Sequence, residues 1–408
     1  MGKTGGNSRM KGQAEKEVMA KEKIKQSFLK EILYYRDEKG QLVENPSVTD
    51  ISFNGTDAYV QDNEVGRYLV DSPQDPRIKK GMKPLNITAE DIANLGNTVQ
   101  NVMGVQWNTS EPILDVELGE LRTNFMNQQV SPYGETFALR VSRPRLAITD
   151  VSNLCDADTA QLLSVIMKTG MNLLISGQTG SGKTEFQKAL IGYIPDMRKI
   201  SLMEDTLDSH IKKIYPHKDI NSWATSGELD SENYIGFPEL IRSGLRNNPD
   251  WLMISEVRGG EAQDLLSAAL TGHSIMTTLH ATGADNIPSR LSNMVATGNS
   301  NINFEALQLD IVSVLNLGVH LHMKIDEETG RVSREIREIF EYTGYVKGTG
   351  IIGRPIFERK LDYDPDTNIY SEQIIKRRLS DRLLKRITNA REIHNIPAVF
   401  KDGEYDGD

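Results

Sequence analysis

The eight residues at 177–184, GQTGSGKT, constrain the fold of this chain more than any other stretch. Four small or apolar residues precede them and predict a buried strand, and the segment 185–190 that follows predicts a helix. Glycines in the loop can bring backbone N–H groups close to an anion at the helix N-terminus. Lys183 would neutralise the β- and γ-phosphates of a nucleotide, and the Thr184 hydroxyl would ligate Mg²⁺. The predicted nucleotide-binding residues are Gly177, Gln178, Thr179, Gly180, Ser181, Gly182, Lys183 and Thr184.

The composition limits the kind of protein that this chain can be. Its 408 residues, of which 38% are hydrophobic and 25% charged, suffice for two or three domains with packed cores. The net charge of -10 argues against general nucleic-acid binding, which needs a basic surface. Cys155 is the single cysteine, so we expect no disulfide within the chain and no multi-cysteine zinc site.

The sequence contains no apolar run near the roughly 20 residues that span a bilayer. Its N-terminal residues also lack an apolar signal region. We therefore expect a cytoplasmic protein whose membrane association, if it has one, comes through partners.

Changes of pattern along the chain predict five parts. Residues 1–35 are expected to form a flexible tail and a charged helix, and residues 36–143 an α+β domain. The segment 144–151 begins with a proline and predicts a hinge. Strands and helices alternate over residues 152–345, and residues 346–408 are expected to form a C-terminal appendage with a basic segment.

Within the first domain, turn residues Asn54 and Gly55 separate two alternating segments and predict a hairpin. A helix is expected over residues 88–102, followed by strands within 113–127 and 135–143. The strands of the second domain are apolar and separated by helices, which predicts an α/β fold with a mostly parallel sheet covered on both faces. A second hairpin is expected with its turn at Glu328 to Gly330.

Acidic residues follow two of the predicted strands, where ligands of open α/β sheets bind. Glu204 and Asp205 end the segment SLMED, and Glu256 ends WLMISE. An acid commonly stands one place earlier on the second strand, but Ser255 occupies that position here. Glu256 would therefore support Mg²⁺ itself, directly or through water. A solvated surface charge is the alternative for each of these acids.

Two histidines flank the strand in GHSIMTTLHA. His280 follows the strand on the predicted active edge and is the stronger functional candidate, whereas a structural role is equally plausible for His273. Phosphoryl transfer also needs positive charge near the transition state, often from an arginine of another domain or subunit. The sequence alone does not rank the candidates, which are Arg122, Arg140, Arg143, Arg145, Arg242, Arg246 and Arg258.

These pieces, in this order, resemble the secretion ATPases of type II and type IV secretion, pilus assembly and conjugation. SVTDISFNG is similar to that family's N-terminal hairpin, and GELRTN with FALRVSR to its paired arginine segments. GQTGSGKT matches its Walker A loop, SLMEDT its acidic box, MISEVRGGEA its Walker B segment and GHSIMTTLHA its histidine box. EVRGGEA and the missing zinc motif are most like the Tad-pilus and conjugation branch. The box departs from the family's usual HANS, since this chain continues HATGADN.

The resemblance implies a hexameric ring of two-domain subunits, each with a RecA-like P-loop core behind an N-terminal α+β domain. It implies that Glu204 is the general base or water-positioning acid and that Glu256 supports Mg²⁺. Arg122 and Arg140 would approach the γ-phosphate of ATP, and His280 would act as a sensor with His273 as its weaker companion. The expected partners are other copies of the chain and inner-membrane platform proteins, with the motor at the inner face of the membrane and no direct binding of nucleic acid.

Two other functions share some of these features. A RecA-like nucleic-acid translocase has the same core, although the acidic net charge counts against it. A nucleotide-gated assembly hub would bind ATP with little turnover, which the intact Lys183, Thr184, Glu204 and Glu256 argue against.

Overall fold

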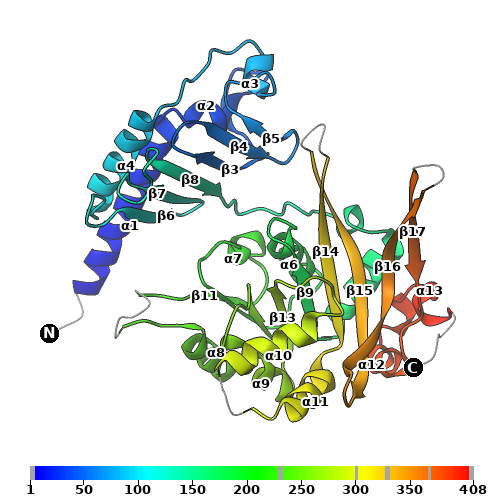
Figure 1. The fold of residues 1–408 in the computed structure, drawn as a ribbon. Helices are drawn as coiled ribbons and strands as arrows, with labels where there is room; N and C mark the ends of the chain where they lie inside the picture. The colour runs from blue at the N-terminus through cyan, green and yellow to red at the C-terminus, as the bar shows by residue number, and fades with distance from the viewer. Residues whose placement is uncertain (1–4, 228–232, 299–301, 327–330, 366–368, 404–408) are drawn as a thin grey trace. The chain divides into compact units, whose positions relative to one another are not determined.

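A computed structural model describes residues 5–227, 233–298, 302–326, 331–365 and 369–403 (Figure 1). The chain forms two compact units, Met1–Arg143 with Ile325–Ser333 and Pro144–Lys324 with Arg334–Asp408. The turn predicted at Glu328 to Gly330 lies outside the described residues.

The N-terminal unit is built around a six-stranded antiparallel sheet with the strand order β5-β4-β3-β8-β7-β6. The predicted hairpin is confirmed as β3 and β4, which flank the turn at Asn54 and Gly55. A separate pair of short strands, β1 and β2, precedes the sheet. The elements are α1 (Gly5–Gln26), α2 (Lys30–Leu33), β1 (Tyr34–Arg36), β2 (Leu42–Glu44), β3 (Val48–Phe53), β4 (Ala58–Asp62), β5 (Gly66–Leu69), α3 (Pro76–Lys79), α4 (Ala89–Met103), β6 (Ile113–Leu118), β7 (Leu121–Met126) and β8 (Thr136–Val141).

Alternation along the strands gives this sheet one buried face. Burial alternates on β6, β7 and β8, so their apolar side chains share a core with α1 and α4. The helix predicted over 88–102 is confirmed as α4, where Thr88 and Asp91 form a capping box and Gly104 ends the helix with φ of 71°. The predicted flexible tail differs from the structure, in which α1 already begins at Gly5.

The second unit contains a nine-stranded sheet with the order β11-β10-β12-β13-β9-β14-β15-β16-β17. The first six strands in this order are parallel, and β15 to β17 extend the sheet with antiparallel pairs. The elements are a 3₁₀ turn (Val151–Asn153), α5 (Ala157–Lys168), β9 (Leu173–Gly177), α6 (Lys183–Ile191), β10 (Ile200–Glu204), α7 (Ile211–Ile214), β11 (Ile220–Ala224), α8 (Phe237–Arg246), β12 (Trp251–Ile254), α9 (Glu261–Leu270), β13 (Ser274–Leu279), α10 (Ile287–Gly298), α11 (Phe304–Val314), β14 (Leu317–Ile325), β15 (Val332–Val346), β16 (Gly350–Asp364), β17 (Ile369–Lys376), α12 (Asp381–Asn389), a second 3₁₀ turn (Ile393–Asn395) and α13 (Ala398–Lys401).

The parallel strands separate two apolar cores, because successive side chains point to opposite faces. On β9, Leu173 and Ile175 pack with α5, α6 and α12, whereas Leu174 packs with the helices α8 to α11. Met253 and Leu252 on β12 divide in the same way. The predicted α/β fold with helices on both faces is therefore confirmed.

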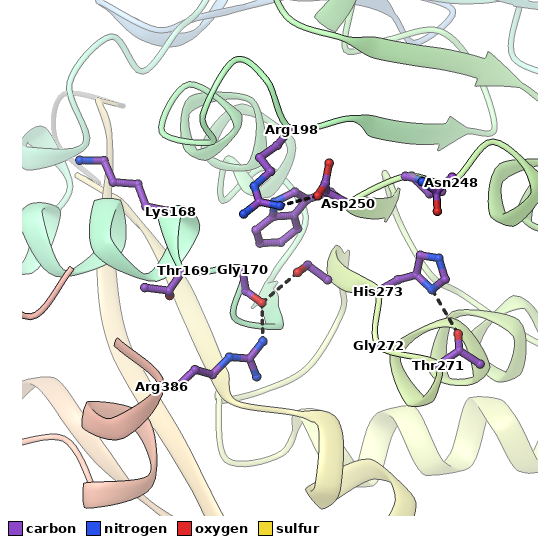
Figure 2. A pocket seen from close by; sticks show the side chains of 13 residues that line it. Lys168, Thr169, Gly170, Arg198, Asn248, Asp250, Thr271, Gly272, His273 and Arg386 are labelled. Carbon is purple, nitrogen blue, oxygen red and sulfur yellow. Dashed lines mark hydrogen bonds and ion pairs between the residues drawn. The ribbon is translucent and has the colours of Figure 1, made fainter. Parts of the chain in front are cut away.

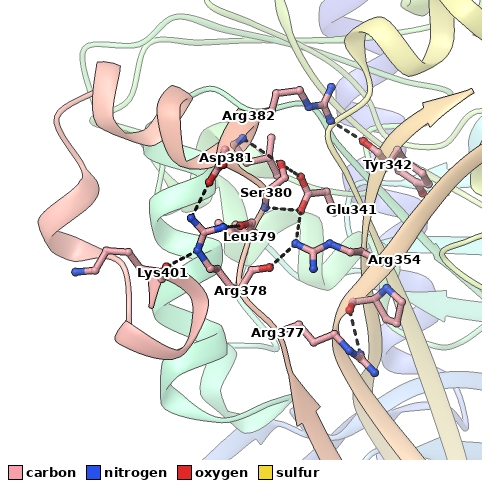
Figure 3. Close-up of polar contacts among 12 residues, drawn as sticks. Glu341, Tyr342, Arg354, Arg377, Arg378, Leu379, Ser380, Asp381, Arg382 and Lys401 are labelled. Atoms are coloured by element: carbon pink, nitrogen blue, oxygen red, sulfur yellow. Dashed lines mark hydrogen bonds and ion pairs between the residues drawn. The ribbon is translucent and has the colours of Figure 1, made fainter. Parts of the chain in front are cut away.

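Residues 346–408, which the sequence pattern sets apart as an appendage, share the sheet and the core of the second unit. Figure 3 shows the polar network at this junction. The buried carboxylate of Glu341 accepts hydrogen bonds from the backbone N–H and hydroxyl of Ser380, the N-cap residue of α12. Arg354 lies 3.8 Å from Glu341, and Arg382 donates to the Tyr342 carbonyl at 2.6 Å. The network fixes α12 against β15, as a buried charge requires partners.

Among the described residues, every helix is too short or too polar to cross a bilayer.

Candidate functional site

The phosphate loop joins β9 to α6 at the carboxyl end of a central strand. Gly180 and Gly182 have φ angles of 80° and 88°, where a β-carbon causes strain. A β-carbon added at Gly177 would lie 2.5 Å from Ser181 Oγ and 2.6 Å from the Leu321 carbonyl oxygen. Glycine is therefore required at these positions for the loop to close over the N-terminus of α6.

Lys183 folds back into the loop. Its Nζ donates to the carbonyl oxygens of Gly177, at 2.9 Å, and Gln178, at 3.1 Å. Burial lowers the pKa of Lys183, and the charge of Glu256 opposes this effect. Ser181 Oγ is buried without a hydrogen-bond partner among the described residues. A phosphate bound by the loop would supply an acceptor to both side chains, so the residues present fit a nucleotide.

Lys183, His280, Glu256 and Arg258 form one chain of polar contacts. His280 Nδ1 lies 3.5 Å from Lys183 Nζ, and His280 Nε2 lies 3.2 Å from Glu256 Oε1. The other oxygen of Glu256 accepts a hydrogen bond of 2.9 Å from Arg258. Burial raises the pKa of Glu256, but Arg258, His280 and Lys183 together hold it below its ordinary value. Glu256 is therefore an ionised carboxylate beside the phosphate loop at neutral pH.

The helix that follows the loop is fastened to the strands that carry these residues. The buried Gln187 on α6 donates to the carbonyl oxygens of Ile254, at the end of β12, and Met276 on β13. Thr184 is half-buried in the first turn of α6, next to Lys183. The fold thus holds Thr184, Lys183 and Glu256 at one edge of the sheet, as the strand-end positions predicted.

Glu204 lies outside this chain of contacts. Its side chain is 1% exposed, and its two oxygens accept hydrogen bonds from the backbone N–H and hydroxyl of Ser209, at 2.9 and 2.8 Å. Burial raises the pKa of Glu204, against the effect of Ser209. The neighbouring Asp205 is exposed, and its charge helps Glu256 to raise the pKa of Arg258. In this structure Glu204 anchors the acidic box, and Asp205 is the acid whose charge reaches Arg258.

His273 and His280 lie at opposite ends of β13. His273 lines a cavity of about 450 Å³ at the amino ends of the strands, and its Nδ1 lies 3.1 Å from Thr271 Oγ1. Figure 2 shows both side chains beside that cavity. His280 follows the carboxyl end of β13, beside Lys183 and Glu256. The two histidines therefore flank a six-residue strand, as the sequence predicted, and only His280 is on the side of the phosphate loop.

Arg122 and Arg140 belong to the N-terminal unit. They are directly opposite each other on β7 and β8, and both side chains are exposed. Arg122 pairs with Glu117 and Arg140 with Asp50, each at 3.0 Å. The sequence segments that carry them therefore form one exposed cross-strand pair.

Three of the remaining arginine candidates are distinguished by their contacts. Arg143 donates to the carbonyl oxygens of Val48 and Asn45 and so holds the N-terminal unit together. Arg242 pairs with Glu239 on the surface of α8. Arg258 is the arginine of this group that contacts Glu256, a distinction that only the fold provides.

A cavity of about 480 Å³ opens beside the phosphate loop, and sequence reasoning missed part of its lining. It is lined by Gly177, Gln178, His280, Ala281, Thr282, His320, Leu321 and His322. His320 Nδ1 lies 2.9 Å from Ser176 Oγ, and burial lowers the pKa of His320. The signal was two histidines with a spacing of two on a strand, which places them on one face of β14.

The sequence profile of a family described as "Type II/IV secretion system protein" matches residues 115–334, more than half of the chain. An uncharacterised protein of Bacillus anthracis is 30% identical over 320 residues, which are 78% of this chain and 68% of that protein. The type IV secretion system protein PtlH of Bordetella pertussis is 36% identical over 134 residues, 32% of this chain and 39% of that protein. The matched segments thus span about two thirds of the first relative and about two fifths of the second.

Among solved structures, the ATPase DotB of Legionella pneumophila is 19% identical and superposes with a TM-score of 0.53, over 72% of this chain and 77% of that chain. At this identity the likeness concerns the fold alone. It confirms the predicted RecA-like P-loop core with an N-terminal α+β domain.

Proposed function

The chain belongs to the type II/IV secretion system protein family, and on this premise we propose that it is an ATP-hydrolysing motor. The motor would power a secretion, pilus-assembly or conjugation machine through motion of one unit against the other. The observation that carries the proposal is the contact chain from Lys183 through His280 to Glu256, beside a phosphate loop whose Ser181 hydroxyl has no hydrogen-bond partner in the part of the chain that the structure describes.

The residues at the carboxyl edge of the sheet would have different roles in ATP hydrolysis. The backbone N–H groups of the loop and Lys183 would hold the phosphates, and Thr184 and Glu256 would hold Mg²⁺. Mg²⁺, when bound, supplies positive charge that neutralises the phosphate oxygens. His280 bridges Lys183 and Glu256 and can sense the phosphate through either contact.

We propose that the acid that positions water differs from the one that the resemblance implies. Glu204, the candidate from the resemblance, is 1% exposed and held by Ser209, so water could reach its carboxylate only after those bonds break, whereas the Glu256 side chain is 23% exposed. Glu256 is ionised and next to Lys183. We therefore assign the water-positioning role to Glu256 and an anchoring role to Glu204.

A ring of subunits would supply the positive charge that the core needs at the transition state. Arg122 and Arg140 form an exposed pair, so they are accessible to a nucleotide held by another domain or subunit. The machine's membrane platform proteins would be the remaining partners. Light scattering on a size column should give the mass of about six subunits when a non-hydrolysed ATP analogue is present. A monomer both with and without the analogue would contradict the proposed ring.

ATP turnover by purified protein tests the motor directly. Lys183→Ala should abolish hydrolysis, and Arg140→Ala should slow it at least about tenfold while the circular dichroism spectrum stays unchanged. Unchanged turnover in Lys183→Ala would overturn the site. Strong stimulation by DNA would instead favour the translocase, and tight binding without turnover the hub.

A further inference from the structure

The segment 144–150, which follows the boundary between the two units, is held by the helix after the phosphate loop. The backbone N–H of Ala147 donates to Glu185 Oε2 at 3.2 Å. Lys188 Nζ donates to the carbonyl oxygen of Arg145 at 3.4 Å. Glu185 and Lys188 are one turn apart on α6 and pair at 2.6 Å. We call these two side chains the linker clamp.

The linker clamp lies directly beside the residues assigned to nucleotide. Glu185 is adjacent in sequence to Thr184 and shares the first turn of α6 with Lys183. The Lys188 side chain is only 3% exposed. Its positive charge lowers the pKa of Glu204 in the acidic box, whereas burial raises it. The Tyr215 hydroxyl fixes the helix by donating to the Lys188 carbonyl at 3.0 Å. A displacement of this turn therefore moves the clamp as well.

A residue from β15 completes the connection. Arg334 Nε donates to the Gly180 carbonyl at 2.9 Å, and a β-carbon on Gly182 would lie 3.1 Å from Arg334 Cδ. Burial lowers the pKa of Arg334, and the charge of Glu185 opposes this effect. Arg334 thus braces the outside of the phosphate loop within electrostatic reach of the clamp.

We propose that Glu185 is a positioning residue that couples nucleotide occupancy to the linker between the two units, with Lys188 as the second arm of its clamp. The inference rests on the proposed function. Ligation of Mg²⁺ by Thr184 would fix the first turn of α6, and with it the carboxylate that holds the Ala147 N–H. Because coupling between two sites is reciprocal, loosening the linker must also alter nucleotide affinity to the same extent.

An i,i+3 ion pair alone would only stabilise α6 itself. That structural role does not involve the linker and cannot make its backbone respond to nucleotide. The contacts to Ala147 and Arg145 therefore distinguish coupling to the linker from simple stabilisation of α6. Hydrogen exchange of the linker backbone measures whether these contacts respond to nucleotide.

The test is hydrogen exchange of a peptide covering residues 144–150 in the full chain, with and without a non-hydrolysed ATP analogue and Mg²⁺. Loss of one charge-assisted hydrogen bond changes exchange by about tenfold. In the unsubstituted chain the analogue should slow exchange by about that factor. Glu185→Ala should exchange about tenfold faster without nucleotide and respond less than about twofold to the analogue, and its Kd for the analogue should rise by about the same factor. Glu185→Gln, which keeps an acceptor, should restore part of the response.

Two further variants protect the result against misfolding of α6. Ala147→Pro removes the N–H donor from the linker side and should abolish the response at Ile148 and Thr149. Glu305→Gln on α11, which alters an exposed ion pair between Glu305 and Lys347, is the matched control and should behave as the unsubstituted chain. An equal linker response in Glu185→Ala and the unsubstituted chain would overturn the coupling. A chain that binds no analogue in a fluorescence titration refutes the proposed function itself, whereas binding without any linker response refutes only the coupling.

Discussion

Cavities of similar size lie at the two ends of the central strands, about 480 Å³ at the carboxyl ends of β9 and β13 and about 450 Å³ at the amino ends of β12 and β13, and different groups surround them. At the carboxyl end, the N-terminus of α6 and a glycine loop meet Lys183, His280 and Glu256. At the amino end, Lys168, Arg198 and Arg386 surround the cavity with His273 (Figure 2).

Helix direction explains the difference between the two ends. In α/β folds the helix N-termini and ligand sites lie at the carboxyl ends of the strands, where N–H groups attract anions. At the amino ends the helices terminate in carbonyl groups, and cations there compensate them. Arg386 does so directly, by donating to the Gly170 carbonyl after α5 at 2.6 Å. Positive charge alone therefore does not identify the nucleotide site.

The largest expected effect comes from removing the acid at the carboxyl end. Glu256→Gln removes the charge but keeps the shape, so kcat for ATP should fall about a thousandfold while nucleotide still binds. Steady-state ATPase assays and a fluorescent-nucleotide titration measure the two quantities. Glu204→Gln, the matched variant on β10, should lower kcat much less, and a reversed order would restore Glu204 as the catalytic acid.

A second effect depends on pH. Glu338 accepts a hydrogen bond from the Ala284 N–H, in the loop after His280. The pKa of Glu338 is raised to about 7, mainly because the side chain is buried and also because of the charges of Asp285 and Glu358. Since this folded-state pKa exceeds the unfolded one, the contribution to stability is complete below the unfolded value and is lost as pH rises through about 7.

Glu338→Gln should therefore stabilise the second unit at pH 8, by about 2 kcal/mol after allowance for the solvent that reaches this side chain, and change little at pH 4.5. Thermal unfolding followed by circular dichroism at both pH values measures the difference. Equal shifts at the two pH values would show that Glu338 titrates normally.

At the amino end we expect an effect on stability without one on chemistry. Arg386→Ala removes hydrogen bonds to the Gly170 carbonyl and Asn316 Oδ1, which should cost about 1.5 kcal/mol. Denaturant unfolding should report that loss, while ATP turnover per folded molecule stays within about twofold. A large fall in kcat would contradict this expectation and show that the amino-end cavity contributes to ATP hydrolysis.

The smallest effect separates the two histidines of one strand. His280→Ala breaks the contacts to Lys183 and Glu256 and should lower kcat about tenfold, the value of one hydrogen bond to a charged group. His273→Ala should change kcat less than about twofold. Comparable losses in both variants would erase the functional distinction between the ends of β13.

Local patterns predicted most of the fold. Glycine spacing, capping residues and apolar runs act over a few residues, which is why the phosphate loop, α4, the β3–β4 hairpin and the apolar strands could be read from the sequence. The edge on which Glu256 and His280 lie also followed, because parallel strands share a carboxyl edge.

Long-range contacts could not be read in the same way. Strand β16 joins the main sheet by pairing with β15, and β17 by pairing with β16, while Glu341 and Ser380, which are 39 residues apart, fasten α12 to β15. The contacts of Arg334 with Gly180 and of His280 with Lys183 depend on how strands and loops pack.

The sequence by itself thus determined the chemistry that is available: a phosphate loop, acids and histidines at strand ends, and a core to hold them. Only the tertiary structure decided which of these groups meet. His280 reaches Lys183 and Glu256, His273 lies at the other end of its strand, and Glu204 is held by Ser209. The physical reason is that residue type and spacing set what a side chain can do, whereas packing of distant segments sets its neighbours, its burial and its charge.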